Sequence, residues 1–278
     1  MGTLIISLRL ALFSSHVSAY TQRTDDAVWR EFMRWAATVP AATFVGEGKK
    51  PAPANALDLY RAKLRSDGVS DQQIDAIVLV LRQRMESSAE WARLVYNNNF
   101  APGVVKVYTE EPNALVAEVA RSRKPGTALD VAMGQGRNAI FLTQQGWQVT
   151  GFDVSEQGLA VAAETAKRLG LSLNLVRSTN EDFDWGTDRW DLIVITYSPH
   201  EGPIERALKR GGVVVMELFL WDPSDSKGGT KPPNLVGPND LLKMFPSLRV
   251  LKYEDMTAKS DWGGVQTRMV RFGAEKPR

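Results

Sequence analysis

The sequence contains no cysteine and only two histidines, His16 and His200, in 278 residues. The lack of cysteine excludes disulfides, thiolate nucleophiles and cysteine-ligated zinc. Two histidines are too few for a histidine-rich metal site or a pair of catalytic histidines, and we predict no metal centre. Any acid–base chemistry therefore depends on one histidine or on tyrosine and carboxyl side chains.

A strong net charge is also missing, because 34 Lys and Arg nearly balance 32 Asp and Glu and leave a formal charge of +2. That value is too small to indicate nucleic acid or an anionic membrane as a partner. With 44% hydrophobic and 24% charged residues, the composition is that of an ordinary soluble protein with a sizeable core. The length fits one large domain, or one domain with an extension.

The apolar N-terminal segment, residues 1–20, is too short to span a bilayer. Its apolar run at residues 4–13, followed by small residues at 17–19, resembles a secretory signal. Against that interpretation, no Lys or Arg precedes the run and Arg9 interrupts it. We expect an N-terminal helix and a cytoplasmic protein, with secretion or an envelope location only if residues 1–19 are a signal peptide.

Residues 21–110 are predicted to form a helical N-terminal extension. Thr24 is a suitable N-cap for the first helix, and Pro40 ends it. Ser70 and Gln73 form a capping-box pattern at the start of the longest helix. These helices are also where a homodimer contact could form. Apolar residues at helical spacing predict helices at residues 24–40, 54–65 and 70–95, and a further helix at 112–122 lies in the next domain.

From residue 127, short apolar strands alternate with helices, within a predicted domain at residues 111–278. The segment 190–197 is almost wholly apolar, as expected for a strand buried on both faces of a sheet. This alternation predicts a parallel sheet with helices on both faces. The expected strands are residues 127–133, 148–154, 171–178, 190–197 and 213–219, with helices at 136–146, 155–169 and 203–210.

The C-terminal end departs from this alternation. Residues 248–253 and 266–272 are predicted strands, but the connection at 254–265 shows no helical pattern. Because this connection is short for a parallel crossover, we predict an antiparallel pair. The fold class is therefore α/β, with a Rossmann-like, seven-stranded, mostly parallel sheet, a terminal antiparallel pair and an N-terminal helical extension.

A glycine-rich turn follows the first predicted strand, in the sequence Asp130-Val-Ala-Met-Gly-Gln-Gly-Arg-Asn138. Gly134 and Gly136 begin a G-x-G-x-x-A pattern, and Asp153 ends the second strand about twenty residues later. Glycines let a ligand approach the backbone, and the acid accepts hydrogen bonds from ribose hydroxyls. The glycines alone leave three alternatives open: a dinucleotide, a nucleoside-containing methyl donor, or a turn without a ligand.

Asp130 favours the methyl donor. A dinucleotide would bring its anionic pyrophosphate to this turn, where a nearby carboxylate is unfavourable. S-Adenosylmethionine has no phosphate and carries an ammonium and a sulfonium, which a carboxylate attracts. Asp130 can also accept hydrogen bonds from the amides of the turn, and the two roles are compatible. The terminal antiparallel pair also argues against a dinucleotide domain.

Three motifs occur in a characteristic order: Asp-x-x-x-Gly-x-Gly-Arg-Asn at residues 130–138, Gly151-Phe-Asp153, and Trp190-Asp-Leu-Ile-Val194. Together they resemble class I S-adenosylmethionine-dependent methyltransferases. The likeness is greatest to the small-molecule branch that includes the tellurite-resistance and thiopurine-type enzymes. It covers about residues 96–276 and not the helices before them.

This resemblance implies S-adenosyl-L-methionine as the cofactor and S-adenosyl-L-homocysteine as its product. It implies that the glycine turn holds the methionine end, that Asp153 binds both ribose hydroxyls, and that residues 180–182 reach the adenine edge. Thr196 and Tyr197 would border the methyl group and the acceptor. The implied donor-binding residues are Asp130, Gly134, Gly136, Arg137, Asn138, Asp153, Val154, Asn180, Glu181, Asp182 and Thr196.

The sequence departs from the family pattern in three places. Ala132 and Met133 stand where a glycine and a small residue are usual, which makes the turn bulkier. Thr179 stands where an acid is often found, which weakens the assignment of the adenine contacts.

The candidate catalytic residues are Tyr197 and His200, which follow the fourth predicted strand at the edge where parallel sheets bind ligands. His200 is placed to act as a base, and a solvated loop histidine is the alternative. Glu217, near the end of the fifth strand, either faces the acceptor or pairs with a Lys or Arg. Five aromatic residues are expected either to close over the donor or to pack in a core, and these are Trp91, Tyr96, Tyr108, Trp221 and Trp262.

The predicted function is methyl transfer to a small molecule, either a thiol, a metalloid, an amine or a phenol. Basic residues are not interleaved with aromatic ones, which disfavours a nucleic-acid acceptor. Substrate choice is expected to lie in the N-terminal helices and in the long loop at residues 222–238. The alternatives are an NAD(P)-dependent oxidoreductase and a non-catalytic protein that binds S-adenosylmethionine.

Overall fold

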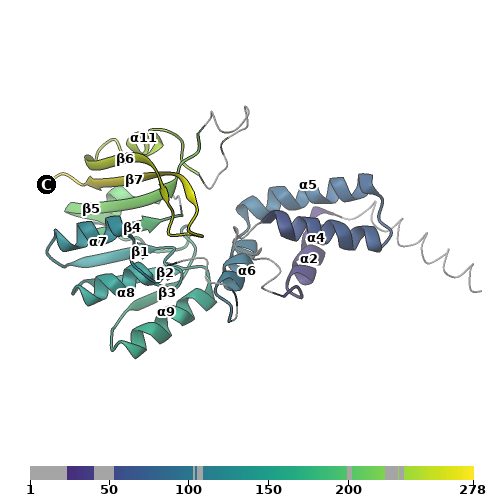
Figure 1. Ribbon diagram of the computed structural model, residues 1–278, viewed down its shortest axis with the longest axis horizontal. Helices are drawn as coiled ribbons and strands as arrows, with labels where there is room; N and C mark the ends of the chain where they lie inside the picture. Colours follow the sequence, from purple (N-terminus) through teal and green to yellow (C-terminus); the bar gives the residue numbers. More distant parts are fainter. Residues whose placement is uncertain are drawn as a thin grey trace, which may run out of the picture. The chain divides into compact units, whose positions relative to one another are not determined.

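The computed structural model describes residues 24–40, 53–102, 104, 109–198, 202–222, 231 and 235–278. The chain divides into two compact units, Met1–Asn98 and Asn99–Arg278 (Figure 1). The predictions for the apolar segment at residues 1–20 lie outside the described residues.

The first unit is helical and packs around an aromatic core. Phe32, on α2, is fully buried, with its ring centroid 5.1 Å from Tyr60 and 5.3 Å from Trp91. Such rings bury large apolar areas, which is what stabilises short helices that have little stability alone. None of the described helices is long and apolar enough to cross a membrane. The helices that begin in this unit are α2 (Asp25–Ala36), α4 (Pro53–Ser66), α5 (Asp71–Ser87) and α6 (Ala89–Asn99).

The predicted single helix at residues 70–95 is wrong, because the helix is interrupted at Ser88, between α5 and α6. Its N-cap and capping box at Ser70 and Gln73 are confirmed. Ser88, however, is extended, with φ −87° and ψ 111°, and its Oγ accepts a hydrogen bond from the backbone N–H of Trp91 at 3.1 Å. The helical spacing of apolar residues continues across this serine, so the spacing alone does not reveal that one helix ends there and another begins.

The second unit contains a seven-stranded sheet in the order β3-β2-β1-β4-β5-β7-β6 (Figure 1). β1 to β5 run parallel, and β7 is antiparallel to both β5 and β6. The predicted fold class, including the antiparallel pair at the end, is therefore confirmed. The strands are β1 (Thr127–Val131), β2 (Gln148–Asp153), β3 (Asn174–Arg177), β4 (Trp190–Thr196), β5 (Leu208–Phe219), β6 (Arg249–Lys259) and β7 (Gln266–Glu275).

Helices cover both faces of the sheet, and neighbouring strand residues alternate between the two cores. Leu192 and Val194 pack with α7 (Ala114–Arg121), α8 (Arg137–Gln144) and α9 (Glu156–Arg168). Ile193 and Ile195 pack on the other face, with α10 (Ile204–Ala207) and α11 (Asp240–Met244). All four strand residues are fully buried, which explains the continuous apolar run that predicted this strand.

The predicted helix at residues 203–210 is mostly wrong. Only α10 is helical, and β5 begins at Leu208, which pairs with Trp190 of β4. Gly211, with φ 76°, donates its N–H to the carbonyl of Lys276 at 2.8 Å. Long-range pairing therefore overrides the local helical pattern, and the strand continues through Gly211 and Gly212.

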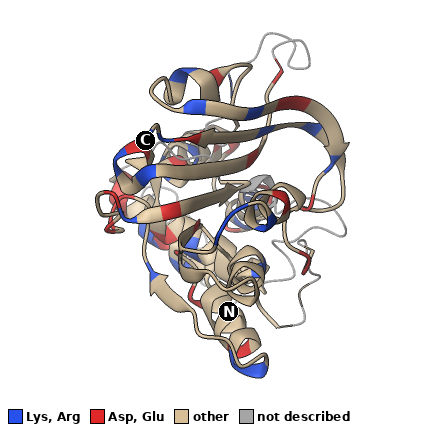
Figure 2. Ribbon diagram, turned by 90° about the vertical axis from the view of Figure 1, so that its left-hand side faces the viewer, with Lys and Arg blue, Asp and Glu red and all other residues tan. Residues whose placement is uncertain are grey.

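Charged residues of both signs occur along β6 and β7 of the second unit (Figure 2). Arg268 and Asp255, from β7 and β6, approach to 2.8 Å, as do Arg249 and Glu275. These exposed pairs leave β6, the edge strand, with mixed charge, which discourages edge-to-edge pairing with other chains.

Candidate active site

The turn between β1 and α8 has a left-handed backbone at three positions. Gly134 and Gly136 have φ angles of 56° and 80°, which glycine adopts without strain. Ala132 has φ 50°, in a region that costs an L-residue about 1–2 kcal/mol. The turn therefore has the usual glycine conformation at residue 132 even though the residue is alanine.

Met133 fills space below the turn. Its Sδ lies 2.2 Å from where a Cβ on Gly151 would be, and its Cε lies 2.8 Å from the same position on Gly136. Side chains at these two positions would collide with the methionine, so the two glycines make room for it. The Met133 side chain, which was expected to make the turn bulkier, is instead buried in the core below the turn.

Asp130 lies buried at the carboxyl end of β1, next to this turn. Its Oδ2 accepts a hydrogen bond from the backbone N–H of Ala139 in α8 at 3.0 Å. Burial raises the pKa of Asp130 to about 7, and the Ala139 hydrogen bond only partly offsets this effect. Asp130 therefore holds the turn against the helix, and a cation bound beside it would favour its ionised form.

Asp153, at the carboxyl end of β2, also bonds the turn. Its Oδ2 accepts from the N–H of Gly134 at 2.8 Å, and its Oδ1 accepts from the N–H of Ser155 at 2.7 Å. Burial raises its pKa, and the backbone hydrogen bonds oppose that shift. Each carboxylate oxygen has a further lone pair with which it can accept a ligand hydroxyl.

Residues 180–182 follow β3 in a turn that is stabilised locally. Thr179 donates its hydroxyl to the carboxylate of Asp182 at 3.0 Å, and the carbonyl of Asn180 accepts from Trp185 Nε1 at 3.0 Å. Glu181 and Asp182 are exposed. The structure thus places these residues one strand beyond Asp153, and Val154 directly follows Asp153.

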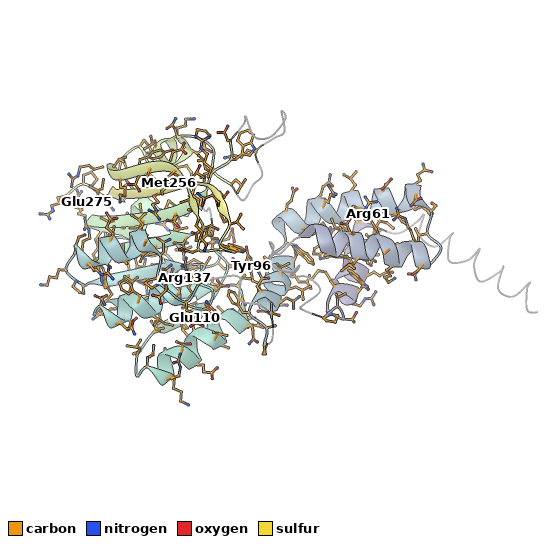
Figure 3. The ribbon with its side chains drawn as sticks, viewed as in Figure 1. Arg61, Tyr96, Glu110, Arg137, Met256 and Glu275 are labelled. Atoms are coloured by element: carbon orange, nitrogen blue, oxygen red, sulfur yellow. The ribbon has the colours of Figure 1, made fainter. Side chains whose placement is uncertain are left out.

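Arg137, which is labelled in Figure 3, and Asn138 begin α8 and take part in a polar network at the carboxyl edge of the sheet. Asn138 accepts from the N–H of Asn113 at 2.9 Å and donates to Thr196 Oγ1 at 3.3 Å. Arg137 is 8% exposed, and its Nη1 donates to Asp261 Oδ2 at 2.8 Å. Its buried Nη2 has no hydrogen-bond partner among the described residues.

Tyr197 is held by the same network. Its hydroxyl donates to Glu217 Oε1 and accepts from the N–H of Asp261 at 3.0 Å. Burial and the neighbouring Glu217 raise the pKa of Tyr197 well above its usual value. Glu217 in turn accepts from Arg271 Nε at 2.6 Å and from Asn113 Nδ2 at 2.7 Å. Of the two alternatives for Glu217, pairing with a basic residue is the one observed.

Other predicted residues are distributed differently. His200 and Tyr108 lie outside the described residues, as does most of the loop at 222–238. Trp91 packs in the aromatic core of the first unit. Trp262, in the β6–β7 connection, has its ring centroid 6.4 Å from that of Tyr197.

Three residues of the network were not predicted: Asn113, Asp261 and Arg271. They come from the N-cap of α7, the β6–β7 connection and β7, and Asn113 and Asp261 alone are 148 residues apart in sequence. One available signal was the Asp-Trp-Gly-Gly sequence at residues 261–264, which lies in a connection with no helical pattern.

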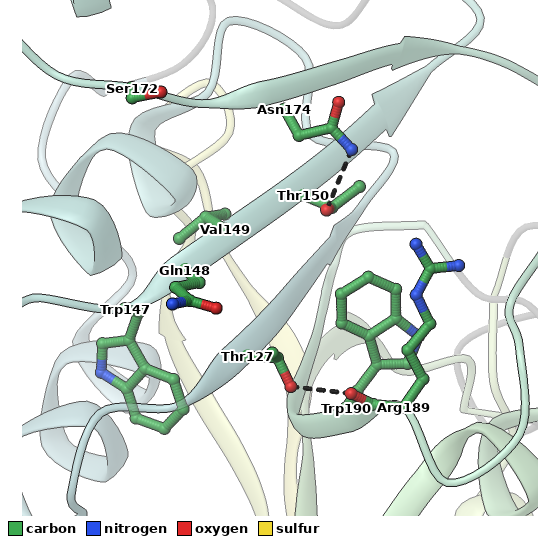
Figure 4. A pocket seen from close by; sticks show the side chains of 9 residues that line it. All are labelled: Thr127, Trp147, Gln148, Val149, Thr150, Ser172, Asn174, Arg189 and Trp190. Carbon is green, nitrogen blue, oxygen red and sulfur yellow. Dashed lines mark hydrogen bonds between the residues drawn. The ribbon is translucent and has the colours of Figure 1, made fainter.

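A cavity of about 420 Å³ lies at the opposite edge of the sheet (Figure 4). It is formed where β1, β2, β3 and β4 begin, whereas Asp130 and Asp153 lie at or near the ends of their strands. Parallel α/β sheets bind ligands at the carboxyl ends of their strands, so this cavity is separate from the candidate site. Its lining residues are Thr127, Trp147, Gln148, Val149, Thr150, Ser172, Asn174, Arg189 and Trp190.

Comparison with known proteins gives one family match and several partial relatives. Residues 128–212 match the family model described as a methyltransferase domain. A ribosomal RNA small subunit methyltransferase C from Alcanivorax borkumensis is 34% identical over 65 residues, 22% of this chain and 20% of that protein. A probable S-adenosyl-L-methionine-dependent methyltransferase, TehB from Haemophilus influenzae, is 34% identical over 59 residues, 21% of each chain. The chain thus spans about a fifth of the length of these relatives.

Comparison with solved structures gives partial matches at low sequence identity. The [4+2]-cyclase SpnF has a TM-score of 0.50 at 20% identity, over 59% of this chain and 78% of that one. TehB from Haemophilus influenzae has a TM-score of 0.49 at 18% identity, over 68% of this chain and 66% of that one. Because one of these proteins is described as a cyclase, the fold by itself does not assign an activity.

Proposed function

Starting from the methyltransferase domain matched by residues 128–212, we propose that this protein is an S-adenosylmethionine-dependent methyltransferase with a small-molecule acceptor. The observation that carries this proposal is Asp130, a buried carboxyl with a raised pKa beside a left-handed glycine turn. A pyrophosphate at this turn would meet a carboxylate, whereas an ammonium would be attracted to it. The comparisons support neither an NAD(P)-dependent oxidoreductase nor a non-catalytic role.

The proposed donor site lies along the carboxyl ends of β1, β2 and β3. Asp130 and the turn would bind the methionine end, and Asp153 would accept the ribose hydroxyls. Residues 180–182 would lie along the adenine edge, with Val154 against its face. The remaining proposed contacts are Gly134, Gly136, Arg137, Asn138 and Thr196, and we assign residues 111–278 to this domain.

The bound donor supplies an activated methyl group, so the protein has to align the acceptor with it. Positioning of this kind can contribute on the order of 7–11 kcal/mol. Tyr197 fits a positioning role, because its hydroxyl is bonded to Glu217 and its raised pKa keeps it neutral. A base is needed only for a protonated acceptor, and His200 is our candidate for it.

The proposed acceptor is a thiol, a metalloid, an amine or a phenol. Mixed charges along the outer strands support a small molecule over nucleic acid, because a nucleic-acid site needs a basic surface (Figure 2).

Calorimetric titration with S-adenosylhomocysteine and, separately, with NAD(H) tests the proposal. We expect S-adenosylhomocysteine to bind and NAD(H) not to bind. Binding of NAD(H) without binding of S-adenosylhomocysteine would refute the proposed function. Radiolabelled donor with a panel of thiols, metalloid oxyanions, amines and phenols then identifies the acceptor class.

A further inference from the structure

Phe100 packs directly against the glycine turn. Its Cζ lies 2.8 Å from where a Cβ on Gly134 would be, and its Cδ2 lies 3.0 Å from the same position on Gly158. Gly158 is in the first turn of α9, so the ring occupies a notch between two glycines that only residues without a side chain leave open. The notch borders the turn proposed to bind the donor.

Phe100 is linked through Gly134 to the ribose-binding acid. The N–H of Gly134 donates to Asp153 Oδ2 at 2.8 Å, and the φ of Gly134 is 56°. The ring against the Cα of this glycine restricts the turn, and the hydrogen bond to Asp153 restricts it further. The packing of Phe100 therefore helps to fix the conformation in which Asp153 meets a ligand.

Asn99 precedes Phe100 and has an unusual environment. Its side chain is 5% exposed, and neither Nδ2 nor Oδ1 has a hydrogen-bond partner among the described residues. A buried amide that bonds nothing is unfavourable and rare in folded proteins, which favours a local rearrangement on ligand binding that gives the amide a partner. An amide offers both a donor and an acceptor, which suits a ligand with hydroxyl, ammonium and carboxylate groups.

We propose that Asn99 and Phe100 complete the donor site, with Asn99 hydrogen-bonding the bound nucleoside donor and Phe100 acting as a positioning residue for Gly134. This inference rests on the proposed methyltransferase function. It extends the donor site beyond the segment 128–212 that matches the family model, to the residues that follow the first helical unit.

The test compares ligand affinity with stability in the full chain. S-Adenosylhomocysteine is titrated calorimetrically into the wild type and the variants Asn99→Ala and Phe100→Ala, and the Tm of each is measured without ligand. We expect Asn99→Ala to weaken binding about threefold to tenfold, the usual effect of one lost hydrogen bond. Its Tm should stay the same or rise, because the variant removes an unsatisfied buried amide.

Phe100→Ala should weaken binding by about tenfold, because the turn loses the ring that holds it. Phe100→Leu keeps part of the packing, should give an intermediate affinity, and serves if the alanine variant does not fold. Asn98→Ala is the matched control, since Asn98 is the neighbouring asparagine of α6 and is only half-buried. Its affinity should equal that of the wild type.

The possible outcomes distinguish a failure of this inference from a failure of the proposed methyltransferase function. If the wild type does not bind S-adenosylhomocysteine, the proposed function fails. If the wild type binds, and Asn99→Ala and Phe100→Leu bind equally well, the inference alone is overturned. A lowered Tm with unchanged affinity would likewise show that both residues serve only packing.

Discussion

The two units treat buried polar groups in opposite ways. In the described part of the first unit, the buried side chains are apolar or aromatic, and charged residues form exposed pairs such as Arg61–Asp75. The second unit buries polar and charged groups, most of them at the carboxyl edge of its sheet. These residues are Asn99, Asn113, Asp130, Arg137, Asn138, Thr150, Asp153, Ser155, Glu217 and Ser260.

Burying a charge is unfavourable unless hydrogen bonds or an opposite charge compensate for it. In the second unit these unfavourable buried groups are concentrated at one edge of the sheet. The same edge contains Ala132, whose left-handed backbone conformation is also unfavourable. The first unit has no comparable concentration among its described residues. The contrast supports the proposal that the helical unit serves stability and the sheet edge serves binding, since proteins depart from simple packing rules mainly at functional sites.

The largest expected effect comes from breaking the pair of Glu217, which is buried, and Arg271, which is partly buried. Glu217→Ala leaves the Arg271 guanidinium, the Tyr197 hydroxyl and the Asn113 amide without their shared acceptor. We expect the free energy of unfolding to fall by about 3 kcal/mol, measured by urea denaturation. Asp255→Ala, which breaks an exposed pair with Arg268, is the control and should cost less than about 1 kcal/mol. Equal losses would contradict the contrast between buried and exposed charges.

The next largest effect concerns ligand affinity. Asp153→Ala removes the carboxylate proposed to bind both ribose hydroxyls and also frees the N–H of Gly134. Hydrogen bonds to charged groups contribute about 1.5–3 kcal/mol, so we expect affinity for S-adenosylhomocysteine to fall about a hundredfold in calorimetry. Asp188→Ala, at an exposed aspartate paired with Lys276, should leave the affinity unchanged. An Asp153→Ala protein that binds normally would refute the ribose assignment.

The sequence predicted the parts of the fold that depend on local pattern. β4 was found because its residues are buried on both faces and therefore apolar throughout. The place of Asp130 and Asp153 beside the glycine turn was predictable, because the two residues lie within or at the end of strands that precede or follow it. The start of β5 was missed, because Leu208 is a strand residue only through its pairing with Trp190.

The polar network could not be predicted for a related reason. Asn113, Glu217 and Asp261 are far apart in sequence and meet only after the sheet is assembled. Each alone looks like an ordinary N-cap, strand acid or loop acid. Phe100 was equally hidden, because the notch that receives it is made by glycines 24 residues apart, Gly134 and Gly158.

A smaller effect is expected from the titration of Asp130, whose pKa burial raises to about 7. In the unfolded chain this group ionises near 4, so between pH 4 and 7 the unfolded chain releases its proton first. The stability contributed by protonated Asp130 is therefore lost as pH rises toward 7. A bound ammonium needs the ionised form, so donor affinity should rise with pH, by up to about tenfold per pH unit below 7.

Calorimetry with S-adenosylmethionine at pH 5.5, 6.5, 7.5 and 8.5 measures this dependence. Asp130→Asn should abolish it and bind weakly throughout. Because histidine side chains ordinarily titrate in this window, His200→Gln is the control and should keep the slope. A flat profile in the wild type would show that Asp130 does not meet the cationic end of the donor.

The smallest expected effect tests the other side of the comparison, the first unit. Arg61→Ala removes an exposed pair in which the Arg61 and Asp75 side chains are 26% and 69% accessible and 2.8 Å apart. Solvent screening and the entropy of two long side chains make such a pair worth about 0.5 kcal/mol. We expect urea denaturation to show no larger loss, and calorimetry to show unchanged affinity for S-adenosylhomocysteine. Weaker ligand binding by this variant would mean that the helical unit affects the donor site through its surface charges, and the division between a stabilising unit and a binding unit would then be wrong.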